Sequence, residues 1–425
     1  MTKLSRRTLI GAGIGAGIGM LAAPAIAQQA TRLRMCWWGG TERVRRTQTA
    51  LDIWKRRNPG VEIATESVGW GDYWTRLATQ VAGGNAPDLI QMDYRYIFEY
   101  ARRRALKSLD EFMPAVIDIR DFGQDNIDHG KVDGQVYAVS LGVNSTAMFY
   151  NQTIFQRANI RPPDHTTTWA QFAEIATNVA RAVNRRGFWG TADAASTEPL
   201  LEAWVRQRGR PLYTAEGRVG FTRDDIAAWF DYWDGLRRSG AAVAGDVQAA
   251  YRDTPETDMA TTGKAAITFA HSNQLIAYQA VTQDRLAMTM YPQGERPGQY
   301  YKPSQLISVA ATTPQGQESA KLVNFLTTDL EAGAALGVER GVPASRRVRE
   351  ALLGEADAGT RAQIEYISLI ADKVGPLPPP PPRGAGEIQN LLRRSYETIS
   401  VGGARVPEAA DRFVAEAART LERAG

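Results

Sequence analysis

Aromatic and polar side chains follow three predicted strands near the start of the chain. Trp37 and Trp38 end the first strand, and Trp70 follows the second. Asp93 and Tyr94 follow the third. An indole ring is flat and apolar, and a pyranose ring has an apolar C–H face with polar edges, so the two stack favourably. The pattern predicts a small-molecule site with aromatic walls, and packing beneath the loops is the alternative for each Trp.

Three basic side chains, those of Arg340, Lys302 and His271, lie next to predicted strands or in predicted turns. Arg340 occupies the turn Glu-Arg-Gly-Val-Pro, where its planar fork suits two hydroxyls or a carboxylate; a surface ion pair or a helix cap is the alternative. Lys302 directly precedes a proline and a predicted strand, and His271 follows the predicted strand 265–269. Lys302 and Arg340 together suggest an acidic sugar, although a neutral oligosaccharide also fits because guanidinium groups bind hydroxyls.

Catalytic and metal-binding motifs are not found in the sequence. The three histidines are far apart, and no His-Glu-x-x-His or Cys-x-x-Cys motif occurs. The chain after residue 27 has neither a Gly-x-Ser-x-Gly elbow nor a phosphate-binding loop. Tyr300 and Tyr301 could ligate ferric iron as phenolates, but an aromatic pair straddling a strand is the simpler interpretation. We therefore predict no catalytic residue, no metal and no cofactor.

The first hundred residues alternate between strands and helices. The segments 33–38, 61–65 and 89–92 are predicted strands, and two amphipathic segments between them are predicted helices. Gly-Gly and Asn-Pro-Gly sequences separate them. Such alternation implies right-handed crossovers and a parallel sheet, in which ligands bind beyond the carboxyl ends of the strands.

The remainder of the chain has longer predicted helices. These are 169–183, 199–208, 224–239, 317–327, 344–353, 391–399 and 407–424. Strands are predicted at 265–269 and 305–310, and the proline run 376–382 predicts a stiff polyproline II connector.

Composition excludes several classes of protein. The 425 residues include 50 basic and 46 acidic side chains, too balanced for a protein that binds nucleic acid through charge alone. The single cysteine, Cys36, excludes an intrachain disulfide, and its position in an apolar strand predicts burial. The length predicts two or three domains.

The N-terminal segment 1–27 has the features of an export signal. It contains Ser-Arg-Arg-Thr-Leu at 5–9, a Gly-rich apolar stretch, and Ala-Ile-Ala at 25–27. We predict a twin-arginine signal peptide and a periplasmic location. A membrane anchor is the alternative, but the apolar stretch is weak. A lipoprotein would need a cysteine after a small-residue cleavage site, and Cys36 does not have one.

Several motifs in chain order resemble family 1 extracellular solute-binding proteins, the receptors of carbohydrate ABC transporters. The likeness covers nearly all of the chain after residue 27. The matching segments are Trp-Trp-Gly-Gly (37–40), Asn-Pro-Gly-Val-Glu-Ile (58–63), Gly-Asn-Ala-Pro-Asp-Leu (84–89), Phe-Tyr-Asn (149–151), Thr-Trp-Ala-Gln-Phe (168–172), Gly-Lys-Ala-Ala (263–266), Tyr-Lys-Pro (301–303), Lys-Leu-Val-Asn-Phe-Leu (321–326) and Glu-Arg-Gly-Val-Pro (339–343). Receptors for plant oligosaccharides, including oligogalacturonides, are the subgroup it resembles most.

The resemblance implies a type II binding-protein fold, with two α/β lobes, three hinge crossings and the ligand between the lobes. It places 31–143 and 304–346 in the first lobe, and 144–303 and 347–425 in the second. It also implies a non-catalytic monomer that binds a carbohydrate and inner-membrane permease subunits. The positions that it implies for ligand contact are Trp37, Trp38, Trp70, Asp93, Tyr94, Asn144, His271 and Arg340.

Two other functions stay open at this point. A secreted hydrolase or lyase acting on polysaccharides would also have an aromatic cleft, but would need two converging carboxylates or a base. A ferric-binding receptor of the same architecture is the other. The sequence His-Ser-Asn at 271–273 departs from the family, which often carries a Gly and an aromatic residue there.

Overall fold

The first sheet is assembled around β1, whose alternate side chains enter two different cores. The computed structural model describes residues 31–250 and 254–424. The predicted export signal, 1–27, lies outside these residues. Leu33, Met35 and Trp37 face one hydrophobic core, whereas Cys36 and Trp38 face another. This two-residue period is that of a strand covered on both faces.

Five strands form this first sheet in the order β2-β1-β3-β11-β6. They are β1 (Thr31–Trp38), β2 (Val61–Val68), β3 (Leu89–Met92), β6 (Ala138–Asn144) and β11 (Lys302–Val309). Strand β1 runs parallel to β2 and β3, as predicted, and β11 runs antiparallel to β3 and β6.

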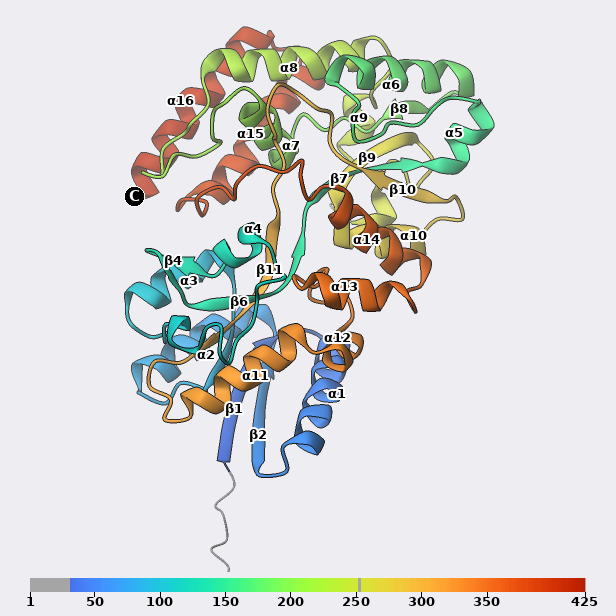
Figure 1. Cartoon of the computed structure of the whole chain (residues 1–425). Coiled ribbons are helices and arrows are strands. Elements are labelled where there is room, and N and C mark those ends of the chain that lie inside the picture. The colour runs from blue at the N-terminus through green and yellow to red at the C-terminus, as the bar shows by residue number, and fades with distance from the viewer. Residues whose placement is uncertain (1–30, 251–253, 425) are drawn as a thin grey trace, which may run out of the picture.

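Helices cover both faces of the first sheet (Figure 1). They are α1 (Thr41–Arg57), α2 (Trp70–Ala82), α3 (Tyr94–Arg102), α4 (Gln124–Asp128), α11 (Gly316–Thr328) and α12 (Leu330–Leu336). A short 3-10 helix, η1 (Asp110–Phe112), and a hairpin of β4 (Lys131–Val132) and β5 (Gln135–Val136) complete this lobe. Helices α2 and α3 begin at the carboxyl ends of β2 and β3, so Trp70 and Tyr94 are helical residues rather than loop residues.

The second sheet has the order β10-β7-β9-β8. Its strands are β7 (Thr146–Asn151), β8 (Trp189–Thr191), β9 (Ala265–His271) and β10 (Leu286–Thr289). Strand β9 is parallel to β8 and antiparallel to β7, which is in turn antiparallel to β10.

The helices of the second lobe pack on several hydrophobic cores, the largest of which is aromatic. They are α5 (Gln152–Ala158), α6 (Trp169–Val183), α7 (Glu198–Gln207), α8 (Arg223–Arg238), α9 (Gly245–Gln248), α10 (Leu275–Ala280), α14 (Ala358–Leu369), α15 (Ala385–Ser400) and α16 (Val406–Ala424). Two 3-10 helices, η2 (Pro255–Thr257) and η3 (Ser272–Gln274), lie beside them. Trp169, Trp204, Trp229 and Trp233 pack together in that core. A capping box between Thr168 and Gln171 starts α6 at the predicted residue.

Three segments run between the two lobes (Figure 1). Strand β6 continues into β7 through Ser145, the chain enters β11 from Tyr300, and the third segment leads from α12 to α13 (Arg346–Leu353). The hydroxyl of Ser145 donates to the carbonyl of Tyr300 over 2.9 Å, which ties the first two crossings together. Backbone hydrogen bonds between Val143 and Val342 tie the first to the third.

The predicted two-lobed α/β fold with three crossings is therefore confirmed. The residue boundaries predicted for the lobes stay a prediction. Within the described residues, no helix is long and apolar enough to cross a membrane.

Candidate functional site

The Trp pair at the end of β1 is packed rather than exposed. Trp37 is 1% exposed, in the core beneath α1 and α11, and Trp38 is 7% exposed. The Trp38 ring meets the ring of Tyr73 edge-on, with centroids 5.1 Å apart. These positions favour the packing alternative for both residues, so ligand contact by either stays a prediction. The side chain of Trp70 lies outside the described atoms.

Two partly exposed aromatic pairs lie on α2 and α3, near the Trp pair of β1. Trp74 and Tyr96 stack with ring centroids 3.8 Å apart, and Tyr94 meets Phe98 edge-on at 5.3 Å. On α3 the Tyr96 side chain projects from roughly the opposite side to Tyr94 and Phe98, so the two pairs face different directions. We call Trp74, Tyr94, Tyr96 and Phe98 the first-lobe aromatic pairs. Of these, only Tyr94 was selected from the sequence. In the sequence these rings are visible only as the pattern Tyr-x-Tyr-x-Phe at 94–98. The direction in which each ring projects depends on the start of α3 at Tyr94, which the sequence did not indicate.

Arg340 is a buried part of the first lobe. It is 3% exposed, and its Nε and Nη2 donate to Gln91 Oε1 at 3.0 Å and to Thr47 Oγ1 at 2.7 Å. Burial, and then the nearby Arg43, lower its pKa to about 9. The neighbouring turn residue Glu339 pairs with Arg43 at 2.8 Å. These contacts join α1, β3 and the turn after α12, so they favour a structural role over the ligand contact suggested by the sequence.

Four of the predicted site residues lie together where the chain crosses between the lobes. Asn144 and Lys302 are register partners at the ends of β6 and β11, and His271 pairs with Thr146 at the start of β7. Asp93 caps α3 by accepting from the backbone N–H of Arg95 at 2.8 Å. Lys302 is exposed and interacts electrostatically with Asp93 and His271.

The environment of this cluster shifts two of its pKa values. Burial raises the pKa of Asp93, and the positive charge of Lys302 opposes that shift. Burial lowers the pKa of His271 to about 3, and Lys302 adds to that effect. Since His271 is neutral at physiological pH, Lys302 provides the positive charge of this group.

Two carboxylates of α7, which the sequence reasoning missed, also face Lys302. Glu198 accepts from the Tyr213 hydroxyl at 2.7 Å, and Glu202 accepts from the Tyr300 hydroxyl at 3.0 Å. Burial raises the pKa of Glu198, and it raises that of Glu202 to about 7; Lys302 opposes both shifts. The signal in the sequence was a Glu at the first position of the helix, followed one turn later by another Glu among apolar residues.

The tyrosine pair considered for ferric iron does not converge. The hydroxyl of Tyr300 meets Glu202, whereas that of Tyr301 donates to the carbonyl of Ile367 at 2.8 Å. Among residues 31–250 and 254–424, no group of three His, Cys, Asp or Glu side chains could hold a metal ion.

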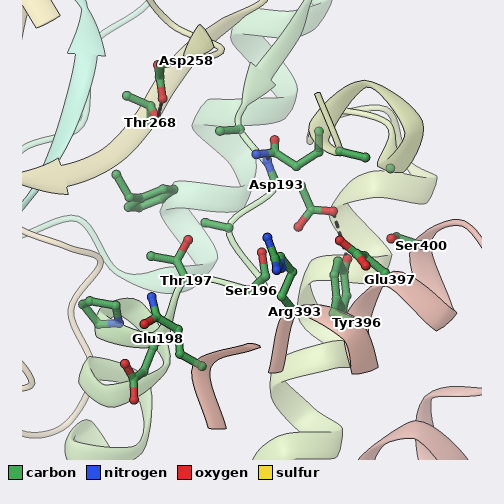
Figure 2. A pocket seen from close by; sticks show the side chains of 18 of the residues that line it. Asp193, Ser196, Thr197, Glu198, Asp258, Thr268, Arg393, Tyr396, Glu397 and Ser400 are labelled. Atoms are coloured by element: carbon green, nitrogen blue, oxygen red, sulfur yellow. Dashed lines mark hydrogen bonds between the residues drawn. The ribbon is translucent and has the colours of Figure 1, made fainter. Parts of the chain in front are cut away.

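A pocket of about 340 Å³ lies in the second lobe, next to Glu198 (Figure 2). This volume lies within the usual range for small-molecule sites. Its walls come from the segment between β8 and α7, from β9, from the region of α9, and from α15. The lining residues labelled in the figure are Asp193, Ser196, Thr197, Glu198, Asp258, Thr268, Arg393, Tyr396, Glu397 and Ser400.

Asp193 is the most perturbed carboxyl group of this pocket. It is 3% exposed, and it accepts from the backbone N–H of Ala195 at 3.2 Å and from the Tyr396 hydroxyl at 3.1 Å. Burial outweighs these two hydrogen bonds and raises its pKa to about 7. The pocket therefore offers hydroxyl, amide and carboxyl groups, all of which hydrogen-bond well to sugar hydroxyls.

The proline run connects the two sides of the site. It leads from α14 to α15 along the edge of the second lobe that faces the first (Figure 1). Arg206 on α7 donates to the carbonyl of Pro376 at 2.6 Å, and the Tyr94 hydroxyl on α3 donates to the carbonyl of Pro378 at 3.1 Å. The run thus contacts a helix of each lobe, and we refer to residues 376–382 as the proline strap.

Comparisons with known proteins agree with this architecture. A family described as bacterial extracellular solute-binding protein matches residues 49–350. A solved family 1 extracellular solute-binding protein from Alicyclobacillus acidocaldarius is 30% identical, with a TM-score of 0.85 over 92% of this chain and 99% of its own. A periplasmic oligogalacturonide-binding protein from Yersinia enterocolitica is 21% identical, with a TM-score of 0.77 over 93% of this chain and 100% of its own.

Curated relatives match over shorter stretches. A lactose-binding protein from Rhizobium radiobacter is 22% identical over 192 residues, which is 44% of each chain. The chain spans less than half the length of the curated relatives that it matches.

Proposed function

Because the chain belongs to the bacterial extracellular solute-binding proteins, we propose that it captures a carbohydrate between its lobes and delivers it to an ABC transporter. The observation that carries this proposal is the hydrogen-bonding pocket of the second lobe, beside Glu198 and Lys302 at the crossing. The Tyr94–Phe98 pair, whose Tyr94 hydroxyl reaches the second lobe, would supply the apolar contact that a sugar ring needs.

Ligand capture in this architecture is a shift between open and closed lobe arrangements. A sugar that touches both lobes gains contacts only in the closed state, so it favours closure by its difference in affinity for the two states. The three crossing segments are the parts that would bend. The closed lobes would then offer their joint surface to the inner-membrane permease subunits.

The proposed site combines residues from both lobes. Lys302, Asp93, Asn144 and His271 would contact the ligand at the crossing, and Glu198 would contact it from α7. Ligand contact by Trp37, Trp38, Trp70, Tyr94 and Arg340, which the sequence predicts, stays a separate prediction that this proposal does not require. The protein itself would act as a monomer in the periplasm, exported by the twin-arginine signal predicted at residues 1–27.

A polysaccharide-processing activity is set aside. The family to which the chain belongs consists of non-catalytic solute-binding proteins. Recovery of unchanged sugar after long incubation with the protein is the expected result.

Thermal unfolding of residues 28–425 with a panel of oligosaccharides tests the proposal. A sugar present at about 100 times its dissociation constant should stabilise the fold by about 2.7 kcal/mol, which gives a clear rise in melting temperature. Asn390→Trp places a bulky ring in the pocket wall on α15 and should abolish that rise. Arg394→Trp, on an exposed part of the same helix outside the pocket lining, is the matched control and should retain it.

If no sugar raises the melting temperature of the unmodified chain, carbohydrate capture is refuted. If Asn390→Trp and Arg394→Trp both retain the full rise, the second-lobe pocket is not the binding site.

A further inference from the structure

Carboxyl groups are the main ionisable groups of the second-lobe pocket. Four of the described lining residues are acidic, and one, Arg393, is basic. The acidic residues are Asp193, Glu198, Asp258 and Glu397.

The two aspartates of this set are built into the pocket wall. Asp193 is held by Ala195 and Tyr396, and Asp258 accepts from the Thr268 hydroxyl at 2.7 Å and from the backbone N–H of Ala260 at 2.8 Å. Both are almost fully buried, so neither can swing away from a ligand. Glu198 is partly exposed and stands between this pocket and the crossing cluster.

Arg393, the basic residue among the described lining residues, donates to Asn390 Oδ1 at 3.4 Å. The cations at the crossing lie among carboxyl groups and carbonyls. Lys302 interacts electrostatically with Asp93 from the first lobe and with Glu198 and Glu202 from the second. Arg206 donates to Pro376 and lies over the Tyr300 ring, 5.0 Å from its centroid.

Arg340, the second cation that the sequence suggests for an acidic ligand, already has hydrogen-bond partners within the protein. Arg340 is buried inside the first lobe and bonded to Gln91 and Thr47. A ligand carboxylate would therefore meet more acceptors than donors on entering the site.

We infer that this site takes a carbohydrate without carboxylate groups and rejects uronates, with Glu198 as the main discriminating residue. The inference rests on the proposed function, because it concerns the same site. Like charges a few ångströms apart repel strongly in a partly desolvated cleft, whereas sugar hydroxyls donate readily to the same carboxylates. The site would therefore differ in ligand class from the oligogalacturonide-binding protein that it resembles in fold.

Matched disaccharides that differ only at C6 provide the probe. We would measure the affinities of glucose, galactose and mannose disaccharides, and of their uronate counterparts, by calorimetry with residues 28–425 at pH 8.5, where Asp193 with its pKa of about 7 is ionised. The neutral member of at least one pair should bind at least ten-fold more tightly than its uronate. Higher salt should narrow that gap, because it screens the repulsion.

Glu198→Gln keeps the shape of the side chain and an acceptor for the Tyr213 hydroxyl while removing the charge. It should reduce the ratio of neutral to uronate affinity by at least three-fold. Asp231→Asn removes an exposed carboxylate of α8 that does not line the pocket, and it should leave the ratio unchanged.

The outcomes separate the inference from the proposed function. Uronates that bind as tightly as the neutral sugars, or more tightly, would overturn the inference and leave carbohydrate capture standing. An unchanged ratio in Glu198→Gln would overturn the role of that residue. If no disaccharide of any charge binds, and no sugar of the oligosaccharide panel raises the melting temperature, both the proposed function and this inference are refuted.

Discussion

Replacing Asp193 with Asn should make the protein more stable in mildly alkaline solution. The carboxyl group is buried against Tyr396, and burial raises its pKa from 3.8 to about 7. In the unfolded chain it has its ordinary pKa, so between about pH 4 and pH 7 the folded state holds a proton that the unfolded state has lost. Stability contributed by this group is therefore complete below about pH 4, is lost progressively as the pH rises from about 4 through about 7, and is fully lost above that.

The size of the effect follows from the pKa difference. The change from 3.8 to about 7 corresponds to about three factors of ten in proton affinity, and each is worth ~1.4 kcal/mol. Ionised Asp193 thus costs the folded state roughly 4 kcal/mol above pH 8. Asn avoids this cost, since its oxygen can accept from Ala195 and its amide can donate to the Tyr396 hydroxyl.

Urea unfolding at several pH values measures this directly. Other groups also titrate, among them His129, whose pKa burial lowers to about 4, so the informative quantity is the difference between Asp193→Asn and the parent. That difference should be small at pH 4.5 and should reach about 2–4 kcal/mol in favour of the variant at pH 8.5. Asp231→Asn should show no such trend. A difference that does not change with pH would refute the assignment of a raised pKa to Asp193.

Three further outcomes are expected. Arg340→Gln should lower the free energy of unfolding by about 2 kcal/mol, because hydrogen bonds to Gln91 and Thr47 are lost; an affinity for sugar reduced ten-fold in the folded variant would instead show ligand contact. Tyr94→Phe removes the hydrogen bond between α3 and the proline strap, worth about 1 kcal/mol, and so weakens a contact between the lobes. The radius of gyration of the ligand-free variant, measured by small-angle scattering, should therefore be larger than that of the parent, and an unchanged value would contradict this. Cys36 should resist alkylation until the protein unfolds, because it is buried and its pKa is raised to about 12; rapid labelling of the native protein would disprove its burial.

The fold could be predicted from sequence because its signals are local. The strands 33–38 and 89–92 are apolar runs bounded by glycine and proline, and α6 begins at a Thr followed three residues later by Gln. Each of these features depends on a few adjacent residues. The start of α3 was missed because Asp93 reads equally well as a strand end and as a helix cap.

The site could not be predicted to the same extent because its contacts are distant in sequence. Arg340 lies 249 residues from Gln91 and 293 from Thr47. The sequence alone could not show that these partners would enclose the guanidinium. Glu202 meets Tyr300 across 98 residues, and without that contact it reads as an ordinary helical carboxylate.

Burial is a second property that the sequence alone could not show. Trp37 and Trp38 end a strand at the edge of the sheet where ligands bind. Their position in the strand does not show whether the indole ring is exposed to a ligand or packed in the core. The packing of α11, which comes almost 300 residues later, decides that Trp37 is covered.

Small-angle scattering of residues 28–425 during titration with the most stabilising sugar tests the central claim most directly. We predict that the radius of gyration falls as the sugar binds. The sugar concentration at half of that fall should agree with the dissociation constant from calorimetry. Tight binding with no change in the radius of gyration would contradict capture between closing lobes.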